Sequence, residues 1–321
     1  GTYVNWLIVS RRLRRYSEKA GNAITLPEYF SNRFHENRKV IMTIAAVFIL
    51  IFFTVYAASC LVTCGKLFST LFDLPYIPMM IVGAVFVLIY TIIGGFLAES
   101  ASDFMQAVVM IIALGVIVCV GTISAGGLGA VIDNVRSIPG FLDFFGIAAP
   151  QTVDGVQQAA GGTPLFGEAA PYGFLPIASA LAWGLGYFGV PQVLLRFMAI
   201  RREDELKRSR RIATVWVVIS LTIAVFIGLV GRTLYPTALT TSSEAENVFI
   251  LLSTNLLPPL LAGFVMAGIL AATISSSDSY LLIAASAFAK NIYQGLFRRK
   301  ASDREVLNIS RITLLLIAVV A

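Results

Sequence analysis

The sequence is poor in the residues that build catalytic and metal centres. It has one histidine and three cysteines among 321 residues. His35 lies in a charged stretch and offers no proton relay, whereas the cysteines lie in apolar stretches, where they pack as small residues. No zinc or disulfide framework follows from them. Because no nucleophile, base and orienting residue group together either, the sequence argues against an enzyme.

Charged residues are also scarce. They make up 13% of the chain, while apolar residues make up 57% and the mean hydropathy is +0.82. Several apolar runs reach the roughly 20 residues that cross a bilayer as a helix. Although the pI is near 9.3, the Lys and Arg residues cluster beside these runs, where membrane topology explains them better than nucleic-acid binding does. We therefore predict an all-α polytopic membrane protein that lies in a lipid bilayer and binds no nucleic acid.

The apolar runs divide the chain into spans and connections. Spans are predicted at residues 1–10, 40–67, 79–97, 104–125, 173–198, 212–234, 260–289 and from 308 onward. The predicted connections are a short helix capped by Thr25, a turn at 71–78, a tight loop at 98–103, an external loop with short helices at 126–172, a basic loop at 199–211 and an amphipathic helix at 244–257. Because the chain starts without Met inside one apolar run and ends inside another, we expect a fragment of a longer protein, with no signal peptide visible.

The distribution of basic residues predicts the orientation in the membrane. Three stretches, at 11–39, 196–211 and 290–311, hold 21 of the 24 Lys and Arg residues. All three fall on one predicted side of the bilayer. Short basic connections stay in the cytoplasm, so these three stretches are predicted to be cytoplasmic.

One spanning segment, residues 182–198, carries its own break. Its helix-breaking residues are Gly184, Gly186, Gly189 and Pro191. Pro191 removes a main-chain donor and displaces the carbonyl of Tyr187, and such a break survives in a membrane only where protein or a wet cavity surrounds it. Trp183, Tyr187 and Pro191, at spacings of four, would share one helical face. We interpret this face as one wall of a substrate site at mid-membrane; the alternative is a glycine-lined helix contact with aromatic packing residues.

A run of hydroxyl residues with one carboxylate, 271–279, lies inside another apolar span. Such a run faces a bundle interior or a cavity. The hydroxyls of Ser275 and Ser276 and the carbonyl of Ala272, three and four residues back, can converge on one point. Sodium is a hard cation that takes oxygen ligands, as the alkaline-earth ions do, so these three atoms could form about half of its shell. The alternative is that the serines bond back to the helix and let helices approach closely.

Two further residues carry open interpretations. Asp103 precedes a span and is followed by Gln106 at the spacing of a capping box, so it is either a helix cap or a carboxylate at a cytoplasmic mouth that attracts a departing cation. Tyr56 lies midway along a span as a buried phenol that needs a partner, and is either a core tyrosine or part of a site.

Four stretches together resemble the sodium:solute symporter family, in order and spacing across essentially the whole chain. They are Trp183-Gly-Leu-Gly-Tyr-Phe-Gly-Val-Pro-Gln with Arg196-Phe-Met-Ala, Ala267-Gly-Ile-Leu-Ala-Ala-Thr-Ile-Ser-Ser, Leu26-Pro-Glu-Tyr-Phe and Tyr90-Thr-Ile-Ile-Gly-Gly-Phe-Leu-Ala. The first is typical of the proline-transporting branch. The resemblance implies a single transporter domain over 1–321 with a five-plus-five inverted-repeat fold, in which 1–125 ends the first repeat, 126–172 is the external loop and 173–321 starts the second repeat.

The resemblance also implies roles for single residues. It assigns the substrate site to Trp183, Tyr187, Pro191 and Tyr56, the sodium site to Ala272, Ser275 and Ser276, and sodium release or a second sodium site to Asp103. Three positions depart from the family pattern: Ser276 replaces a threonine, and Val190 and Gln192 differ from the usual neighbours of Pro191. Asp278 is left without a role. The first core helix of the family, with the remaining sodium ligands, is expected to be absent from this chain.

The function expected from the resemblance is import of proline coupled to sodium, by alternating access, in the bacterial cytoplasmic membrane. Two alternatives remain at this point. The substrate could be another small carboxylate, such as a different amino acid or pantothenate, or the chain could be a transporter-like sensor domain. A channel suits a broken helix with aromatic residues less well.

Overall fold

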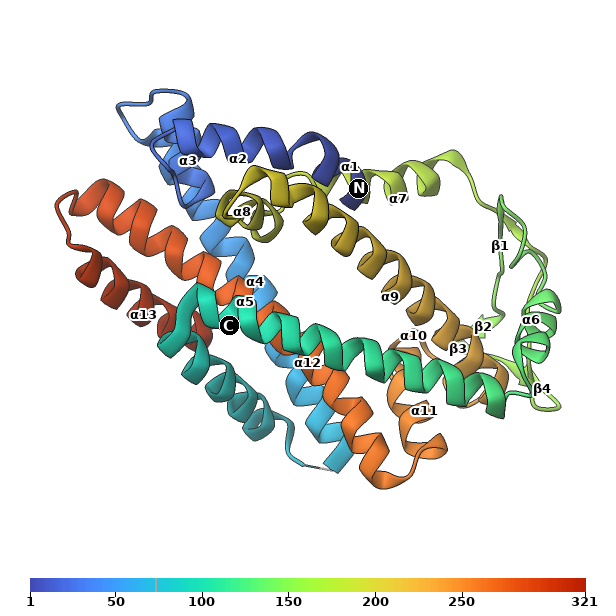
Figure 1. Ribbon diagram of the computed structural model, residues 1–321. Coiled ribbons are helices and arrows are strands. Elements are labelled where there is room, and N and C mark those ends of the chain that lie inside the picture. The colour runs from blue at the N-terminus through green and yellow to red at the C-terminus, as the bar shows by residue number, and fades with distance from the viewer. Residues whose placement is uncertain (73) are drawn as a thin grey trace. The chain divides into compact units, whose positions relative to one another are not determined.

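The computed structural model describes residues 1–72 and 74–321, with side chains for all of these except 71 and 72. The helices are α1 (Thr2–Ile8), α2 (Ser10–Lys19), α3 (Leu26–Arg33), α4 (Val40–Phe72), α5 (Tyr76–Ser124), α6 (Leu128–Arg136), α7 (Phe174–Gly186), α8 (Pro191–Ala199), η1 (Glu203–Glu205), α9 (Leu206–Leu234), α10 (Ser242–Ala245), α11 (Val248–Leu256), α12 (Pro259–Ser286), the π-helix η2 (Ala287–Phe297) and α13 (Asp303–Val320) (Figure 1).

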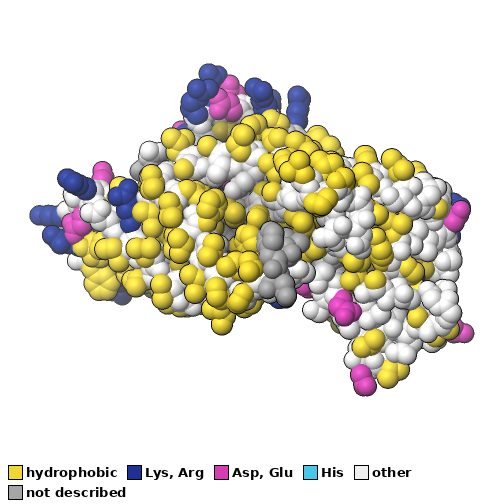
Figure 2. Space-filling view, turned by 90° about the horizontal axis from the view of Figure 1, so that it is seen from below, with side chains coloured by type: hydrophobic (Ala, Val, Ile, Leu, Met, Phe, Trp, Pro, Cys, Tyr) yellow, Lys and Arg dark blue, Asp and Glu magenta, His cyan; other side chains and the backbone are white. Residues whose placement is uncertain are grey.

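Within the described residues, five helical segments are long and apolar enough to cross a membrane. They are Val40–Thr70, Tyr76–Ser124, Phe174–Ala199, Glu203–Leu234 and Pro259–Phe297. Apolar side chains accordingly cover much of the face seen in Figure 2, whereas Lys and Arg side chains gather at its edges. So much exposed apolar surface is typical of a protein in contact with lipid. The prediction of an all-α polytopic membrane protein is confirmed.

The chain divides into two compact units. Residues 1–107, 184–214 and 270–321 form the first unit, and residues 108–183 and 215–269 form the second.

Two apolar clusters hold the first unit together. The larger joins α4, the first part of α5, α12 and α13 through Phe53, Ala57, Val87, Leu281 and Leu314. The smaller joins α2, α3 and α8 through Leu13, Leu26, Leu194, Phe197 and Met198. Burying a Leu or Phe side chain contributes about 1.5–3 kcal/mol, so the second cluster fixes α8, the helix that follows the break, on α2 and α3.

The second unit has a core of its own and a short strand region. Its core includes Ala113, Ile117, Val131, Val230 and Leu252. The strands are β1 (Gly146–Ile147), β2 (Thr152–Val153), β3 (Val156–Gln157), β4 (Ala159–Ala160), β5 (Thr163–Pro164) and β6 (Ala170–Pro171), paired antiparallel as β1 with β6, β2 with β3, and β4 with β5. The predicted loop 126–172 therefore contains the expected short helix, α6, and also strand pairs that the sequence did not signal.

Two predicted connections are wrong. The loop expected at 98–103 is helical, and the chain reverses instead at Gly95, whose φ of 55° and ψ of −147° interrupt α5. Glycine adopts this positive φ without the steric cost that other residues meet. The turn expected at 71–78 is shorter, because α4 continues to Phe72 and α5 begins at Tyr76; residue 73 lies outside the described residues.

Other local predictions are confirmed. The Thr25 side chain accepts a hydrogen bond from the backbone N–H of Glu28 at 3.4 Å and caps α3. The break in the predicted span 173–198 is also present, since α7 ends at Gly186 and α8 begins at Pro191. Both features depend on residues close in sequence, which is why the sequence alone signals them.

Candidate functional site

The broken helix leaves one backbone carbonyl for a side chain to satisfy. Pro191 occupies the first turn of α8, where its missing N–H costs nothing to that helix. The carbonyl of Tyr187, four residues earlier, accepts a hydrogen bond from Asn5 Nδ2 at 3.0 Å. Asn5 lies on α1 and is fully buried. The sequence predicted that Pro191 displaces this carbonyl, but not what would pair with it.

The helical face predicted through Trp183, Tyr187 and Pro191 does not form. Residues 187–190 leave the helix, so the four-residue spacing no longer aligns the three side chains. Trp183 belongs to α7 in the second unit and is 76% exposed. Tyr187 and Pro191 belong to the first unit and are half-buried.

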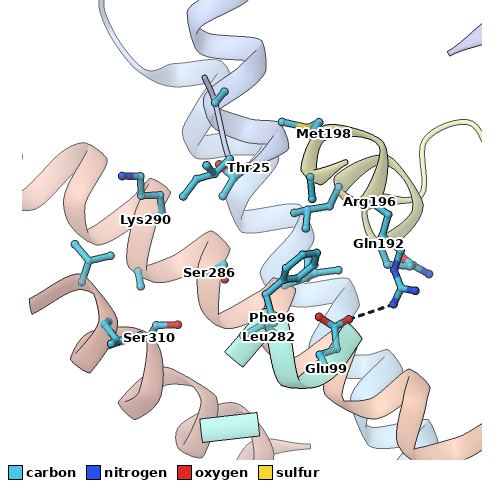
Figure 3. Close-up of a pocket in the computed structure, with 18 of the residues that line it drawn as sticks. Thr25, Phe96, Glu99, Gln192, Arg196, Met198, Leu282, Ser286, Lys290 and Ser310 are labelled. Carbon is cyan, nitrogen blue, oxygen red and sulfur yellow. Dashed lines mark hydrogen bonds and ion pairs between the residues drawn. The ribbon is translucent and has the colours of Figure 1, made fainter. Parts of the chain in front are cut away.

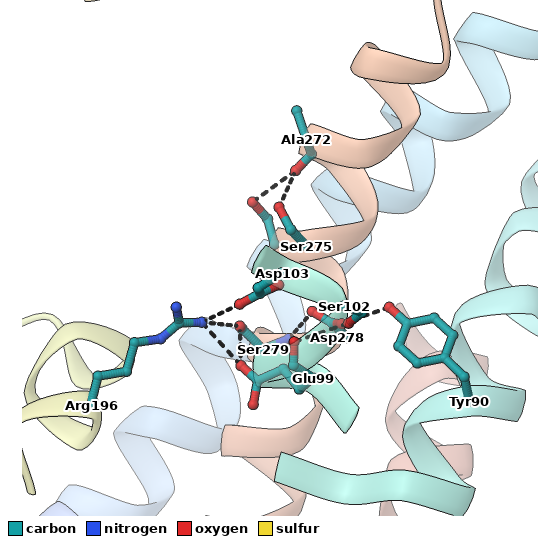
Figure 4. Close-up of polar contacts among 10 residues, drawn as sticks. Tyr90, Glu99, Ser102, Asp103, Arg196, Ala272, Ser275, Asp278 and Ser279 are labelled. Carbon is teal, nitrogen blue, oxygen red and sulfur yellow. Dashed lines mark hydrogen bonds and ion pairs between the residues drawn. The ribbon is translucent and has the colours of Figure 1, made fainter. Parts of the chain in front are cut away.

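The three oxygens of the predicted sodium site do converge. Ser275 Oγ lies 3.0 Å and Ser276 Oγ 3.2 Å from the Ala272 carbonyl oxygen (Figure 4). At metal–oxygen distances of about 2.4 Å, neighbouring ligands of a six-coordinate hard cation lie roughly 3.4 Å apart, so this spacing suits such a cation. The same contacts are the back-bonds of the alternative interpretation, and each hydroxyl oxygen keeps lone pairs while it donates. These residues therefore fit sodium, as part of a shell.

A buried ionic network lies on α12 and on the part of α5 that follows Gly95. The Arg196 guanidinium, from α8, donates to Glu99 Oε1 at 3.2 Å and to Asp103 Oδ2 at 2.5 Å (Figure 4). It also lies 3.2 Å from Ser279 Oγ, whose hydroxyl donates to Glu99 Oε1. The Glu99 side chain is 4% exposed and the Asp103 side chain 14%, against 45% for Arg196. A half-exposed guanidinium thus pairs with two carboxylates that are largely buried.

Asp278, the carboxylate that the sequence left without a role, continues this network. It is fully buried, and Tyr90 donates its hydroxyl to Asp278 Oδ2 at 2.6 Å. The backbone N–H of Ser279 donates to Asp278 Oδ1 at 2.7 Å. A buried carboxylate is tolerated when its oxygens accept such bonds. The region therefore holds three carboxylates, of which Arg196 contacts two.

Asp103 is not a helix cap, contrary to one of its two interpretations. It lies inside α5, eight residues after the interruption at Gly95, because the residues predicted as a loop are helical. One oxygen pairs with Arg196, whereas the other, Asp103 Oδ1, is buried with no hydrogen-bond partner among the described residues. The residue is therefore an acceptor in the network with spare capacity.

Tyr56 is not the buried phenol that was expected. It is 51% exposed. Its ring lies 5.2 Å from that of Tyr280 and 6.1 Å from that of Phe53, measured between centroids. Tyr56 therefore lies on the exposed surface of α4.

The sequence missed Glu99, Tyr90 and Arg196 as members of this network. Glu99 was assigned to a polar loop, and Arg196 was counted among the basic residues of a cytoplasmic stretch. One signal was available: Glu99 and Asp103 are four residues apart and would share a helical face, which makes a shared cationic partner favourable.

A cavity of about 470 Å³ opens beside the network. Glu99 and Arg196 lie at one end of it, and Thr25, Lys290 and Ser310 line the other parts (Figure 3). The lining comes from the loop before α3 and from α5, α8, α12, η2 and α13. Most of these elements flank the basic stretches, so the cavity lies toward the side that the charge distribution assigns to the cytoplasm.

Several helices long enough to cross a membrane, one of them broken, together with a buried ionic network are typical of a secondary transporter. The sodium:solute symporter family model matches residues 1–321, and the chain belongs to this family. The resemblance drawn from the motifs is confirmed. Because this is a transport family, the conclusion that the chain is not an enzyme stands.

Curated relatives match the chain over its whole length. The high-affinity proline transporter PutP of Bacillus subtilis (strain 168) is 37% identical over 321 residues, which is 100% of this chain and 63% of the relative. The osmoregulated proline transporter OpuE of the same strain is 37% identical over 322 residues, 61% of its length. The sodium/proline symporter of Staphylococcus aureus is 36% identical over 324 residues, 59% of its length. The chain thus spans about 60% of the length of these relatives.

A solved structure supports the fold. It is described as the substrate-bound outward-open state of a Na⁺-coupled sialic acid symporter with a novel Na⁺ site. The match has a TM-score of 0.73 at 15% identity and covers 99% of this chain and 66% of that chain. At this identity the likeness concerns the fold alone.

Proposed function

We propose that this chain is the part of a symporter that couples inward sodium flow to the import of proline by alternating access. The observation that carries the proposal is the convergence of the Ala272, Ser275 and Ser276 oxygens at one point. The names of the relatives, which are proline transporters and a sodium/proline symporter, support the choice of ions and substrate. In this proposal the protein spans the bacterial cytoplasmic membrane several times.

The proposed sodium site uses the two hydroxyls and the carbonyl as three of about five or six oxygen ligands. In this state the hydroxyl protons point to the carbonyl, so binding a cation would require only that the hydroxyls rotate. The other ligands must come from a second element.

The proposed substrate site comprises Tyr187 and Pro191 at the break, with Trp183 and Tyr56 as further members. Non-helical backbone at membrane depth can present carbonyl and amide groups to a small zwitterion, and the aromatic rings can cover its apolar ring. The half-buried Tyr187 and Pro191 are consistent with one wall of a site that other parts of the full protein complete.

We further propose that Asp103 attracts sodium on its way to the cytoplasm. Its spare oxygen, Oδ1, which has no hydrogen-bond partner among the described residues, supports this role. Asp103→Asn in the full-length protein should slow sodium-dependent uptake while leaving helix α5 intact, because the residue is not a cap. Unchanged uptake and an unchanged sodium dependence would remove Asp103 from the path of the ion.

The division into repeats is part of the same proposal. Residues 1–125 would end the first repeat, 126–172 would form the external loop and 173–321 would start the second repeat. Reaction of single cysteines placed in 126–172 with impermeant reagents on intact cells would test the external position of this loop.

The decisive experiment is sodium dependence of proline uptake by full-length variants at positions 275 and 276. Loss of one ligand should cost roughly 1–3 kcal/mol, on the scale of a buried polar group left unpaired, and raise the apparent sodium constant about 5- to 150-fold. Alanine and cysteine should be about equally damaging, since sulfur is a poor sodium ligand, and threonine at 275 should be tolerated best.

A matched control lies one residue further on. Ser277 is buried, whereas Ser275 and Ser276 are half-buried, and like them it bonds back to a carbonyl of its own helix, that of Thr273, at 2.9 Å, but it is not among the proposed ligands. Ser277→Ala should leave the sodium constant within about twofold of wild type. If all three alanine variants behave alike, or threonine is the worst substitution at 275, the sodium site is wrong. If the protein takes up another small carboxylate with sodium but does not take up proline, the proposed substrate is wrong and the sodium site stands.

A further inference from the structure

Asn5 is a buried polar residue. It lies on α1, is fully buried, and is not part of the ionic network. Burying an amide costs free energy unless its groups are hydrogen-bonded. Asn5 Nδ2 donates to the Tyr187 carbonyl at 3.0 Å, across 182 residues of sequence. Since a carbonyl can only accept, this contact also settles which end of the amide faces the break.

The break leaves the Tyr187 carbonyl without its partner in a helix. Phe188 N–H donates to the Leu185 carbonyl at 3.0 Å, and Gly189 N–H donates to the Gly186 carbonyl at 3.0 Å. In an uninterrupted helix the carbonyl of Tyr187 would pair with the N–H of residue 191, which proline does not have. The Asn5 amide stands in for that missing donor.

Helix α1 contacts the chain on both sides of the break. On the α7 side, a Cβ added to Gly1 would lie 2.6 Å from the Gly184 carbonyl oxygen, so the two backbones are in direct contact. On the α8 side, the Trp6 and Phe197 rings pack edge to face with centroids 4.5 Å apart. Asn5 contacts the break between these two points. The packing contacts hold α1 in place, and the amide supplies the directional contact with the interrupted backbone.

We propose that Asn5 is a positioning residue for the broken helix, whose amide replaces the hydrogen bond that Pro191 removes and thereby sets the course of residues 187–190. This inference rests on the proposed function in one respect, namely that the break forms a wall of the substrate site. If Asn5 positions the break, its effect on substrate affinity depends on Pro191. If it only fills space, its effect is the same whatever residue occupies that position.

A double-mutant cycle separates these cases. The full-length protein is compared with Asn5→Leu, Pro191→Ala and the double variant, by thermal midpoint in detergent and by the affinity for radiolabelled proline at fixed sodium concentration. Asn5→Leu keeps the branched shape of the side chain but removes the donor. With Pro191 present, it should weaken proline binding about 5- to 150-fold, which corresponds to roughly 1–3 kcal/mol for an unpaired buried group. In the Pro191→Ala protein, where the backbone regains an N–H, the same change should weaken binding less than about twofold.

Ser17→Ala is the matched control. Ser17 is buried on α2 and donates to the Arg14 carbonyl at 2.8 Å, away from the break. It should change proline affinity less than about twofold in either background. Asn5→Ala is taken through the same cycle if Asn5→Leu does not accumulate in both backgrounds.

The inference is overturned if the Asn5 substitution lowers the proline affinity and the thermal midpoint equally in two backgrounds, the protein that keeps Pro191 and the Pro191→Ala protein. A larger loss with Pro191 present, in the thermal midpoint and in the proline affinity, supports it. If the wild type binds no proline at all, the proposed function fails, and the thermal midpoints of the four proteins still decide the role of Asn5.

Discussion

Removal of the Arg196 charge tests the ionic network most directly. Arg196→Gln keeps a polar but shorter and uncharged side chain, and it leaves Glu99 and Asp103 without the cation that contacts both, at 3.2 and 2.5 Å. Removing one partner of a buried ion pair costs about 3–5 kcal/mol, because the charge left behind is uncompensated. The Arg196 side chain is 45% exposed, so water screens part of this interaction, and we expect about 2–3 kcal/mol.

The measurement is the free energy of unfolding of the purified full-length protein in mixed micelles. Arg201→Gln is the matched control, since Arg201 is 79% exposed and pairs with Glu205 at 2.6 Å. An exposed pair of this kind contributes about 0–1 kcal/mol. A second arm adds Glu99→Gln to Arg196→Gln. It should restore part of the lost stability, because it removes the charge of one of the two carboxylates left without a cation.

Two results would refute this reasoning. The first is a loss no larger for Arg196→Gln than for Arg201→Gln, which would mean that the carboxylates do not need the guanidinium. The second is a loss that Glu99→Gln deepens instead of relieving. That result would point to lost hydrogen bonds and packing around Arg196, and not to uncompensated charge.

Three further outcomes are expected. Trp183→Ala should weaken proline binding while folded protein in detergent stays near the wild-type level; an equal loss of folded protein would make Trp183 a core residue. Ser286 lines the cavity that is assigned to the cytoplasmic side. The thiol introduced by Ser286→Cys should therefore react with an impermeant maleimide in inside-out vesicles and not in right-side-out vesicles. The opposite pattern of labelling would reverse that assignment. Hydrogen bonds from the backbone of Thr241 and Thr240 hold the pKa of Glu244 below its usual range. The capping box of α10 therefore contributes its full stability at any pH above the usual glutamate pKa. This contribution is lost as the pH falls through the lowered pKa of Glu244. Thr240→Val removes one hydroxyl donor to Glu244 and should raise the pKa of Glu244. The carboxyl carbon shift of Glu244 in an NMR titration would report this pKa. An unchanged pKa would show that the backbone donors suffice.

The sequence was sufficient for features that depend on composition or on near neighbours. Hydropathy alone identified a polytopic helical membrane protein, because a spanning helix must be apolar along about 20 consecutive residues. The break before Pro191 and the cap at Thr25 were likewise readable, since proline, glycine and capping side chains act within one helical turn. The convergence of Ser275 and Ser276 on the Ala272 carbonyl follows from helix geometry in the same way.

Tertiary structure decided which polar residues could be buried. Glu99 and Asp103 were predicted to lie in a loop because charges inside a spanning helix are costly. Arg196, which is 97 and 93 residues away from them, offsets that cost, and a pairing at this distance leaves no local pattern in the sequence. The Tyr187 carbonyl is a similar case: sequence showed that Pro191 would leave it unpaired, but only the packing of α1 against the break brought Asn5 to it. Local sequence thus sets which backbone and side-chain groups need a partner, whereas the fold decides which distant residue supplies it.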